Sequence, residues 1–217
     1  NANGLLKLEL RMLGSIIMKA ADRARVPAVS ALCVDRARFA QSVTEAIESS
    51  PLITVIRAEA KELVEEHINV LAPGPLASPS LARLLEDLVG MRNLFFYDAV
   101  SPIVEADSID MSKAYRLARY DKGDSTYLNL PLTREQYIAF VTELRNAEVV
   151  PKREFEEDRF FAACMPVEEL ARKGDETLAH GCMKPVGLRD PRTGRIPYAV
   201  VQLRPENREE TMYGMVG

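Results

Sequence analysis

The sequence is poor in cysteine and lacks several features that mark familiar classes of protein. Its 217 residues include only three cysteines, Cys33, Cys164 and Cys182. An odd number at wide spacing argues against a disulfide framework and for reduced thiols in a cytoplasmic setting. No apolar run is long enough to span a bilayer and nothing resembles a signal peptide, so no membrane partner is expected. A glycine-rich dinucleotide-binding turn is also absent.

Excess positive charge is missing as well. The formal net charge is −4, whereas proteins that grip nucleic acid over their whole surface are usually basic. DNA is therefore not an expected partner, although local basic clusters could still contact RNA. The length and the 47% content of hydrophobic residues suit one large globular domain or two small ones.

The first ninety residues alternate between helical and strand-like patterns. Apolar residues from Leu5 to Ile17 predict one helix that ends before Pro27, and residues 35–49 predict a second with Asp35 as its N-cap. Residues 51–63 and 68–76 are expected as strands, followed by a helix at 78–90 with Ser78 or Ser80 as its cap. This alternation is typical of an α/β domain.

The pattern changes near Met91. Strand-like segments at 93–107, 125–132, 183–188, 195–204 and 211–217 are separated by turn residues. Two helices interrupt them, one after the cap Thr133 and one at 166–174. We therefore predict two domains, residues 1–90 of α/β class and residues 91–217 of α+β class with a mainly antiparallel sheet.

Cys164 precedes the second of these helices. Pro166 suits the first helical position, which makes Met165 the cap and leaves Cys164 one residue outside. The positive end of a helix stabilises a thiolate, but Glu168 and Glu169 in the first turn oppose it, unless Arg159 offsets them. From these residues alone, a packed and inert cysteine is the better interpretation and a nucleophile the alternative.

The other candidate site residues are His180 and Cys182, which could bind a metal, and a set of basic residues, which could bind phosphate. His180 stands two residues before Cys182, but no second ligand pair follows at a recognised spacing, so no metal site is expected. The basic residues of two loops could contact phosphates, or could simply be solvated. These residues are Arg116, Arg119, Lys122, Lys184, Arg189, Arg192 and Arg195.

A series of strings along the chain resembles one family. The strings "GPLASPSL", "FFYDAVSPIVEADSIDMSKA", "RYDKGD", "CMPVEELARKG" and "MKPVGLRDPRTGRIPYAVVQLR" are similar, in order and spacing, to those of the folate- and FAD-dependent tRNA (uracil-5-)-methyltransferase family. The resemblance implies a Rossmann-like FAD-binding domain, to which residues 1–90 would belong, with an inserted α+β domain. It implies methylation of uridine C5 in the tRNA T-loop. The carbon would come from 5,10-methylenetetrahydrofolate and the electrons from FAD reduced by NADH or NADPH.

The resemblance also implies roles for particular residues. Cys164 would be the thiolate that adds to uracil C6, while Ala60, Ala72 and Gly74 would contact FAD. The basic residues would face tRNA. The family's glycine-rich turn and a second functional cysteine would precede Asn1, and a last FAD segment would follow Gly217. The chain is therefore expected to be a middle piece that binds FAD weakly or not at all by itself.

Two departures from the family pattern keep alternatives open. Val29 and Ser30 replace two glycines, and Pro73 replaces a residue with a backbone N–H. Both changes bear on flavin binding. A divergent flavoprotein that modifies another uridine, in ribosomal RNA or at the wobble position, and a non-catalytic RNA-binding homologue are the alternatives.

Overall fold

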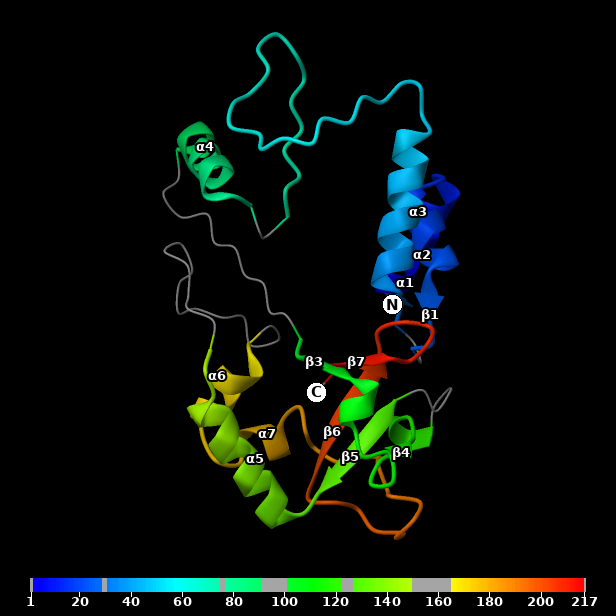
Figure 1. Ribbon diagram of the computed structural model, residues 1–217, viewed down its shortest axis with the longest axis vertical. Coiled ribbons are helices and arrows are strands. Elements are labelled where there is room, and N and C mark those ends of the chain that lie inside the picture. The colour runs from blue at the N-terminus through cyan, green and yellow to red at the C-terminus, as the bar shows by residue number, and fades with distance from the viewer. Residues whose placement is uncertain are drawn as a thin grey trace.

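The computed structural model describes residues 2–28, 31–74, 77–90, 101–121, 127–149 and 165–216. Helices dominate the N-terminal part, and the C-terminal part forms an antiparallel sheet with helices packed beside it (Figure 1). The described part of the chain contains no helix long and apolar enough to cross a membrane.

Two helices stand where the sequence predicts one. Helix α1 spans Ala2–Met12 and helix α2 spans Ile16–Arg23. Gly14 between them has a φ of +73°, and the Ser15 hydroxyl accepts a hydrogen bond from the N–H of Met18. A left-handed glycine ends one helix and a serine cap begins the next, so these local signals outweigh the continuous apolar periodicity.

A short hairpin and a third helix complete this region. Strand β1 (Arg25–Val26) pairs antiparallel with β2 (Cys33–Val34), and helix α3 (Arg36–Glu48) follows. The predicted N-cap is confirmed, because the Asp35 carboxylate accepts a hydrogen bond from the N–H of Arg38.

The two strands predicted between residues 51 and 76 are wrong for the described part of that range. Residues 51–74 form neither helix nor strand, and Ile68 is 96% exposed. The β-branched residues favour an extended chain, but a strand also requires a neighbour to accept and donate its backbone hydrogen bonds. Helix α4 (Pro79–Val89) follows, with the predicted Ser78 cap confirmed.

The antiparallel sheet predicted for the second half is confirmed. Its strand order is β3-β7-β6-β5-β4, and Leu128 on β5 lies opposite Leu203 on β6. The predicted strand at 183–188 is wrong, since this segment forms turns and includes Gly187 with a φ of +73°. The strands are β3 (Ile103–Glu105), β4 (Tyr115–Arg116), β5 (Leu128–Leu132), β6 (Ala199–Pro205) and β7 (Met212–Met215).

Short helices join and cover this sheet. The capping box at the start of α5 confirms Thr133 as its N-cap, with Gln136 reciprocating. The elements are the 3₁₀ turns η1 (Ala106–Ser108) and η2 (Arg119–Asp121), and the helices α5 (Arg134–Asn146), α6 (Val167–Arg172) and α7 (Thr177–His180).

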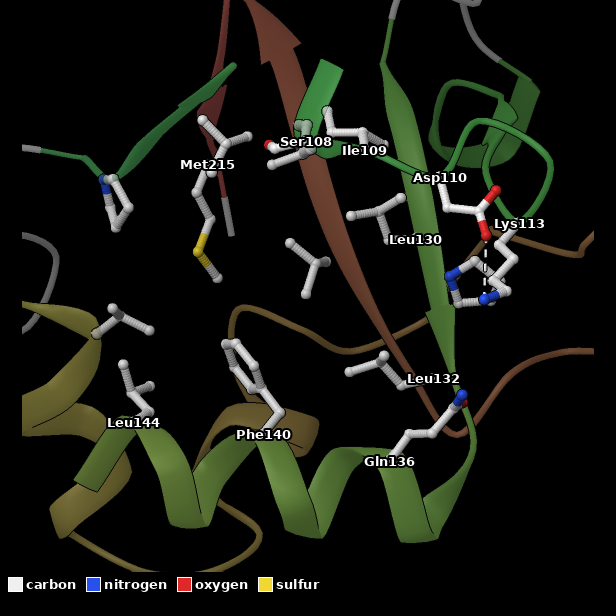
Figure 2. A pocket seen from close by; sticks show the side chains of 16 residues that line it. Ser108, Ile109, Asp110, Lys113, Leu130, Leu132, Gln136, Phe140, Leu144 and Met215 are labelled. Carbon is white, nitrogen blue, oxygen red and sulfur yellow. Dashed lines mark ion pairs between the residues drawn. The ribbon is translucent and has the colours of Figure 1, made fainter. Parts of the chain in front are cut away.

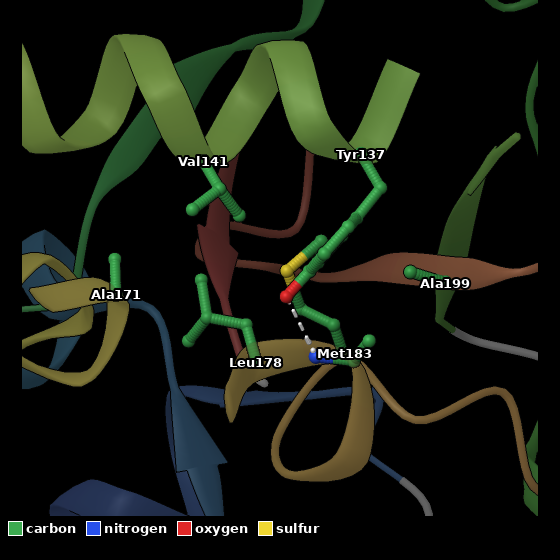
Figure 3. Packing of buried hydrophobic residues seen from close by; sticks show 7 residues of the cluster. Tyr137, Val141, Ala171, Leu178, Met183 and Ala199 are labelled. Atoms are coloured by element: carbon green, nitrogen blue, oxygen red, sulfur yellow. Dashed lines mark hydrogen bonds between the residues drawn. The ribbon is translucent and has the colours of Figure 1, made fainter. Parts of the chain in front are cut away.

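The main core lies between α5, α6, α7 and β6. Figure 3 shows Tyr137 and Val141 pointing from α5 toward Leu178 and Met183. The Tyr137 hydroxyl donates to the carbonyl of Asp175 at 2.6 Å and accepts the N–H of Ala179 at 3.1 Å. The one polar atom of this large buried ring is thus satisfied at both its donor and acceptor positions.

The β6–β7 turn contacts the N-terminal helices. Arg208 donates hydrogen bonds to the carbonyls of Arg23 and Arg25, and Arg38 pairs with Glu209 at 2.6 Å. Figure 1 shows this turn beside β1. Because the Arg38–Glu209 ion pair is exposed, it contributes little to the free energy of folding by itself. The main effect of these contacts is to hold the β6–β7 turn against the N-terminal helices.

Candidate functional site

Cys164 lies outside the described residues, but the helix that follows it is described. Pro166 is the N-cap of α6 and Val167 its first helical residue, so the prediction of Met165 as the cap is wrong. The extended ψ of 145° at Pro166 explains the shift by one residue. Glu168 and Glu169 do occupy the first turn. A helix of six residues with two acids at its start offers little stabilisation to a thiolate upstream.

The predicted FAD contacts lie on the exposed segment 51–74. Ala60 and Ala72 are exposed. Gly74 has a φ of +70°, and a Cβ built on it would meet nothing within 4 Å, which leaves space for a planar ring to approach the backbone. The backbone of these three residues is therefore accessible, which a backbone contact to FAD would require.

Glu59 connects this segment to the start of α4. The nearby hydroxyls of Ser78 and Ser80 lower the pKa of the Glu59 carboxyl, with a smaller contribution from Lys61. Segment 51–74 therefore comes close to the start of α4 at Glu59.

Arg119 joins two loops by hydrogen bonds to backbone carbonyls. Its guanidinium donates to the carbonyls of Lys184 at 2.7 Å, Val186 at 3.2 Å and Cys182 at 3.5 Å. It also donates to Oε1 of Gln202 at 3.3 Å. Because these acceptors occupy most of its N–H groups, Arg119 acts on the position of the loops more than on a ligand.

The Gln202 side chain extends this connection into the sheet. Its Nε2 donates to Oδ1 of Asn129 at 3.0 Å. The Asn129 amide in turn donates to the carbonyls of Leu117 at 2.9 Å, Tyr115 at 3.2 Å and Tyr127 at 3.3 Å. Both amides are buried, and such a satisfied network makes its surroundings rigid. Sequence reasoning missed it, although a lone asparagine in the apolar string "YLNLPL" is a usable signal.

Arg192 is engaged in a similar way. It pairs with the buried Asp190 at 2.8 Å and donates to the carbonyls of Ser112 at 2.7 Å and Lys113 at 2.8 Å. Its guanidinium also lies over the ring of Tyr115, 5.7 Å from the centroid. Hydrogen bonds from Arg192 are the main reason that the pKa of Asp190 is lowered. Burial raises the pKa of Tyr115 to about 12.

The remaining basic residues divide into two groups. Arg116 pairs with Glu210 and donates to the hydroxyl of Tyr213, and Arg189 donates to the carbonyl of Gly194. Lys184 and Arg195 are exposed, and neither side chain has an ion pair or hydrogen bond to another described residue. Lys122 lies outside the described residues. Within the predicted RNA-contact set, Lys184 and Arg195 are thus the described side chains most available to a phosphate.

Cys182 has the properties of a packed cysteine. It is half-buried beside the core, and burial is the main reason that the pKa of its thiol is raised. Such a thiol is a poor nucleophile near neutral pH. No group of three or more His, Cys, Asp or Glu side chains that could hold a metal occurs among the residues that the structure describes.

An apolar cavity of about 490 Å³ lies between the sheet and α5. In Figure 2, Phe140 and Leu144 point into it from α5, opposite Leu130 and Met215. Its polar end holds Asp110, which pairs with Lys113 at 3.0 Å. The described lining is mainly apolar, and its Ser108 hydroxyl and Lys113 amine are engaged with the Glu105 carbonyl and with Asp110, so it suits the binding of an apolar group.

Comparisons with known proteins agree over the whole chain. A family model described as "Glucose inhibited division protein A" matches residues 1–217. A curated relative from Geobacter sulfurreducens, named methylenetetrahydrofolate--tRNA-(uracil-5-)-methyltransferase TrmFO, is 56% identical over 218 residues, which is 100% of this chain and 50% of that protein. Proteins of the same name from Lysinibacillus sphaericus and Dictyoglomus thermophilum are each 52% identical over 217 residues, 100% of this chain and 49% of theirs.

These matches confirm the family resemblance that the sequence motifs indicate. The chain spans about half the length of the curated relatives it matches.

Proposed function

The chain belongs to the glucose inhibited division protein A family, and from this premise we propose that it forms part of an enzyme that methylates C5 of a uridine in tRNA. The observation that carries the proposal is the identity of 52–56% across all 217 residues to proteins named for that activity. The T-loop uridine is the proposed target, and 5,10-methylenetetrahydrofolate the proposed carbon donor.

FAD and the folate would supply the groups that amino acids lack. When bound, the folate supplies a methylene carbon, and FAD reduced by NADH or NADPH supplies the electrons that convert it to methyl. Residues 1–90 would belong to the FAD-binding domain and residues 91–217 to the inserted domain. Ala60, Ala72 and Gly74 would hold the FAD through their backbone, since the open space at Gly74 permits close approach.

Cys164 would be the nucleophile. Its thiolate adds to uracil C6, which forms a C–S bond and moves an electron pair to C5, so that C5 can attack the methylene carbon. C5 would then lose its proton while the bond between the methylene carbon and the folate nitrogen breaks, so that the folate leaves as its amine. A hydride supplied by reduced FAD would reach the methylene carbon as the C–S bond breaks and the Cys164 thiolate is released. Because α6 is short and acidic at its start, the residues that lower the pKa of this thiol would come from elsewhere in the active site.

The tRNA would lie along the loops around Arg119 and Lys184. Lys184 and Arg195 would contact phosphates directly, while Arg119 and Arg192 would hold the loops that carry them. A chain of net charge −4 can bind RNA through such a local patch because electrostatic contacts act within about one Debye length.

The experiment compares single cysteine variants of the protein expressed from its complete coding region. Wild type, Cys164→Ala and Cys182→Ala are incubated with FAD, NADPH, methylenetetrahydrofolate and unmodified tRNA, and 5-methyluridine is measured by mass spectrometry. We expect Cys164→Ala to lose at least about 10³-fold in activity, because the nucleophile is removed. Cys182→Ala should stay within about threefold of wild type, since that thiol only packs.

The outcomes separate the alternatives. Product from Cys164→Ala at the wild-type rate would remove Cys164 from the mechanism. RNA binding without product from the wild type would refute the methyltransferase proposal and favour a non-catalytic RNA-binding protein. Product at another uridine would favour the divergent flavoprotein.

A further inference from the structure

The turn between β6 and β7, residues 206–211, contacts two helix ends of opposite polarity. Helix α2 ends at Arg23 and α3 begins at Arg36. The N–H of Asp35, the N-cap of α3, donates to the carbonyl of Ala24, the C-cap of α2, at 2.8 Å. The negative end of one helix dipole therefore lies beside the positive end of the other.

The charges of the turn match this arrangement. Arg208 donates hydrogen bonds to the carbonyls of Arg23 and Arg25, at a helix end where the last carbonyls have no partner within the helix. Glu209 pairs at 2.6 Å with Arg38 in the first turn of α3. A cation thus meets the negative helix end and an anion lies near the positive one, which is the order that the dipoles favour.

Hydrogen bonds within the turn hold its shape. Oδ1 of Asn207 accepts the N–H of Thr211 at 3.0 Å, and Nδ2 of Asn207 donates to the Thr211 hydroxyl at 2.6 Å. Glu210 has a φ of +53°, and its carboxylate accepts from the Tyr213 hydroxyl at 2.9 Å and pairs with Arg116 on β4. The two charged residues that meet the helix ends are therefore presented by a loop that is already ordered.

The strands on either side of the turn tie it to the sheet. β6 pairs with β5 and β7, and β7 pairs with β6 and β3, so both are inner strands. Their backbone hydrogen bonds on both sides oppose movement of the turn relative to the sheet. The position of the sheet is thus passed on to α2 and α3 through the turn.

The proposed function makes the relative position of these two parts important. Residues 1–90 would belong to the FAD-binding domain, whereas the inserted domain would carry Cys164 and the RNA contacts. Electrons from FAD must then reach a methylene carbon on a uracil that Cys164 holds. A misplacement of about 1 Å between reacting groups can lower a rate about 10²-fold.

We infer that Arg208 and Glu209 are positioning residues, which set the orientation of the FAD-binding domain relative to the inserted domain. This inference rests on the proposed function, which supplies the reaction that the orientation serves. Both residues act through the ends of α2 and α3 and not through contact with RNA, folate or FAD.

The first experiment separates the joint reaction from the steps that each domain performs alone. In protein expressed from the complete coding region, Arg208→Met removes every donor to the α2 carbonyls but keeps a side chain of similar apolar length. The rate of FAD reduction by NADPH and the Kd for unmodified tRNA should stay within about twofold of wild type. The kcat for 5-methyluridine formation should fall at least about tenfold.

Arg11→Met is the matched control. It also removes an exposed arginine, but the partner of that arginine, Asp22, lies in the same N-terminal region, on α2. All three quantities should therefore stay within about twofold of wild type.

Exchange of two charges tests the direction of the pairing. Glu209→Arg and Arg38→Glu each place like charges opposite each other, and each should lower kcat at least about threefold at low ionic strength, where exposed charges are screened least. The double variant restores an opposite pair and should recover kcat to within about twofold of wild type.

A distance measurement tests the orientation without the reaction. Spin labels are placed through non-canonical amino acids at Gln41 on α3 and Ile138 on α5, both exposed, so that the native cysteines stay unchanged. The distribution of distances between the labels should be broader in Arg208→Met than in wild type and unchanged in Arg11→Met.

Three results would overturn the inference. They are a wild-type kcat in Arg208→Met, an unchanged distance distribution in that variant, and equal losses in FAD reduction, tRNA binding and methylation, which would indicate a general loss of folding. Failure of the proposed function looks different, because wild-type protein would then form no 5-methyluridine, and the positioning role would be refuted with it. Product from wild type and Arg208→Met at the same rate would refute the positioning role alone.

Discussion

Replacing Asn129 by leucine should destabilise the protein strongly. Asn129 is fully buried at 0% exposure, and its amide donates to three backbone carbonyls and accepts from Gln202. Leucine can make none of these bonds. The N–H of Gln202 and the carbonyl of Leu117, which accepts the shortest of the three bonds, would then be buried without partners.

The expected loss follows from these two groups. A buried donor or acceptor left without a partner costs about 1–3 kcal/mol. Two such groups place the loss in the free energy of unfolding at about 2–5 kcal/mol, a large share of the stability of an ordinary domain. Urea denaturation monitored by circular dichroism measures this change as a shift of the midpoint at constant m-value.

Two further variants make the test specific. Gln41→Leu removes an exposed amide that bonds only to Glu45 among the described residues, and it should change stability by less than about 0.5 kcal/mol. The double variant Asn129→Leu/Gln202→Leu should lose less free energy of unfolding than the sum of the losses of the two single variants. In each single variant one amide is left buried without its partner, whereas in the double variant both amides are gone. Strictly additive losses, or a loss below about 1 kcal/mol for Asn129→Leu, would refute the network as described.

Two more predictions concern the core and the Asp190–Arg192 pair. Tyr137→Phe removes the hydroxyl that bridges Asp175 and Ala179 and should cost about 1–2 kcal/mol in the same urea assay; an unchanged midpoint would contradict this. The pKa of Asp190 is lowered by Arg192, so the pair contributes stability above the ordinary aspartate pKa of about 4, and this contribution is lost as the pH falls through the lower folded value. The stability difference between wild type and Arg192→Met should therefore shrink from pH 5 to pH 2, and a constant difference would argue against the pair.

Helix starts could be predicted from the sequence because their causes are local. Asp35, Ser78 and Thr133 each accept a hydrogen bond from an N–H three residues later. That interaction depends only on the chain around the cap. The break between α1 and α2 also has a local cause, because it depends on Gly14 and Ser15. A glycine followed by a serine is therefore a signal from which such a break can be predicted.

Strands and arginine roles could not be predicted in the same way. Ile56, Ile68 and Val70 have the residue types of a buried strand but are exposed, because strand formation depends on a partner that the pattern itself does not name. Arg119 and Arg192 occupy basic loops that the sequence predicts to face phosphate. Their partners include carbonyls 63 to 80 positions away in sequence, which only the tertiary fold reveals.

The engagement of these arginines changes how the chain would bind RNA. A guanidinium that already donates to several carbonyls can reach a phosphate only by giving up some of those bonds, at a cost in loop order. The basic side chains free of such bonds in the described part of the predicted set are Lys184 and Arg195, a small number for a chain of net charge −4. Few phosphate contacts imply a shallow dependence of affinity on salt. More of the binding would then come from contacts that salt does not screen.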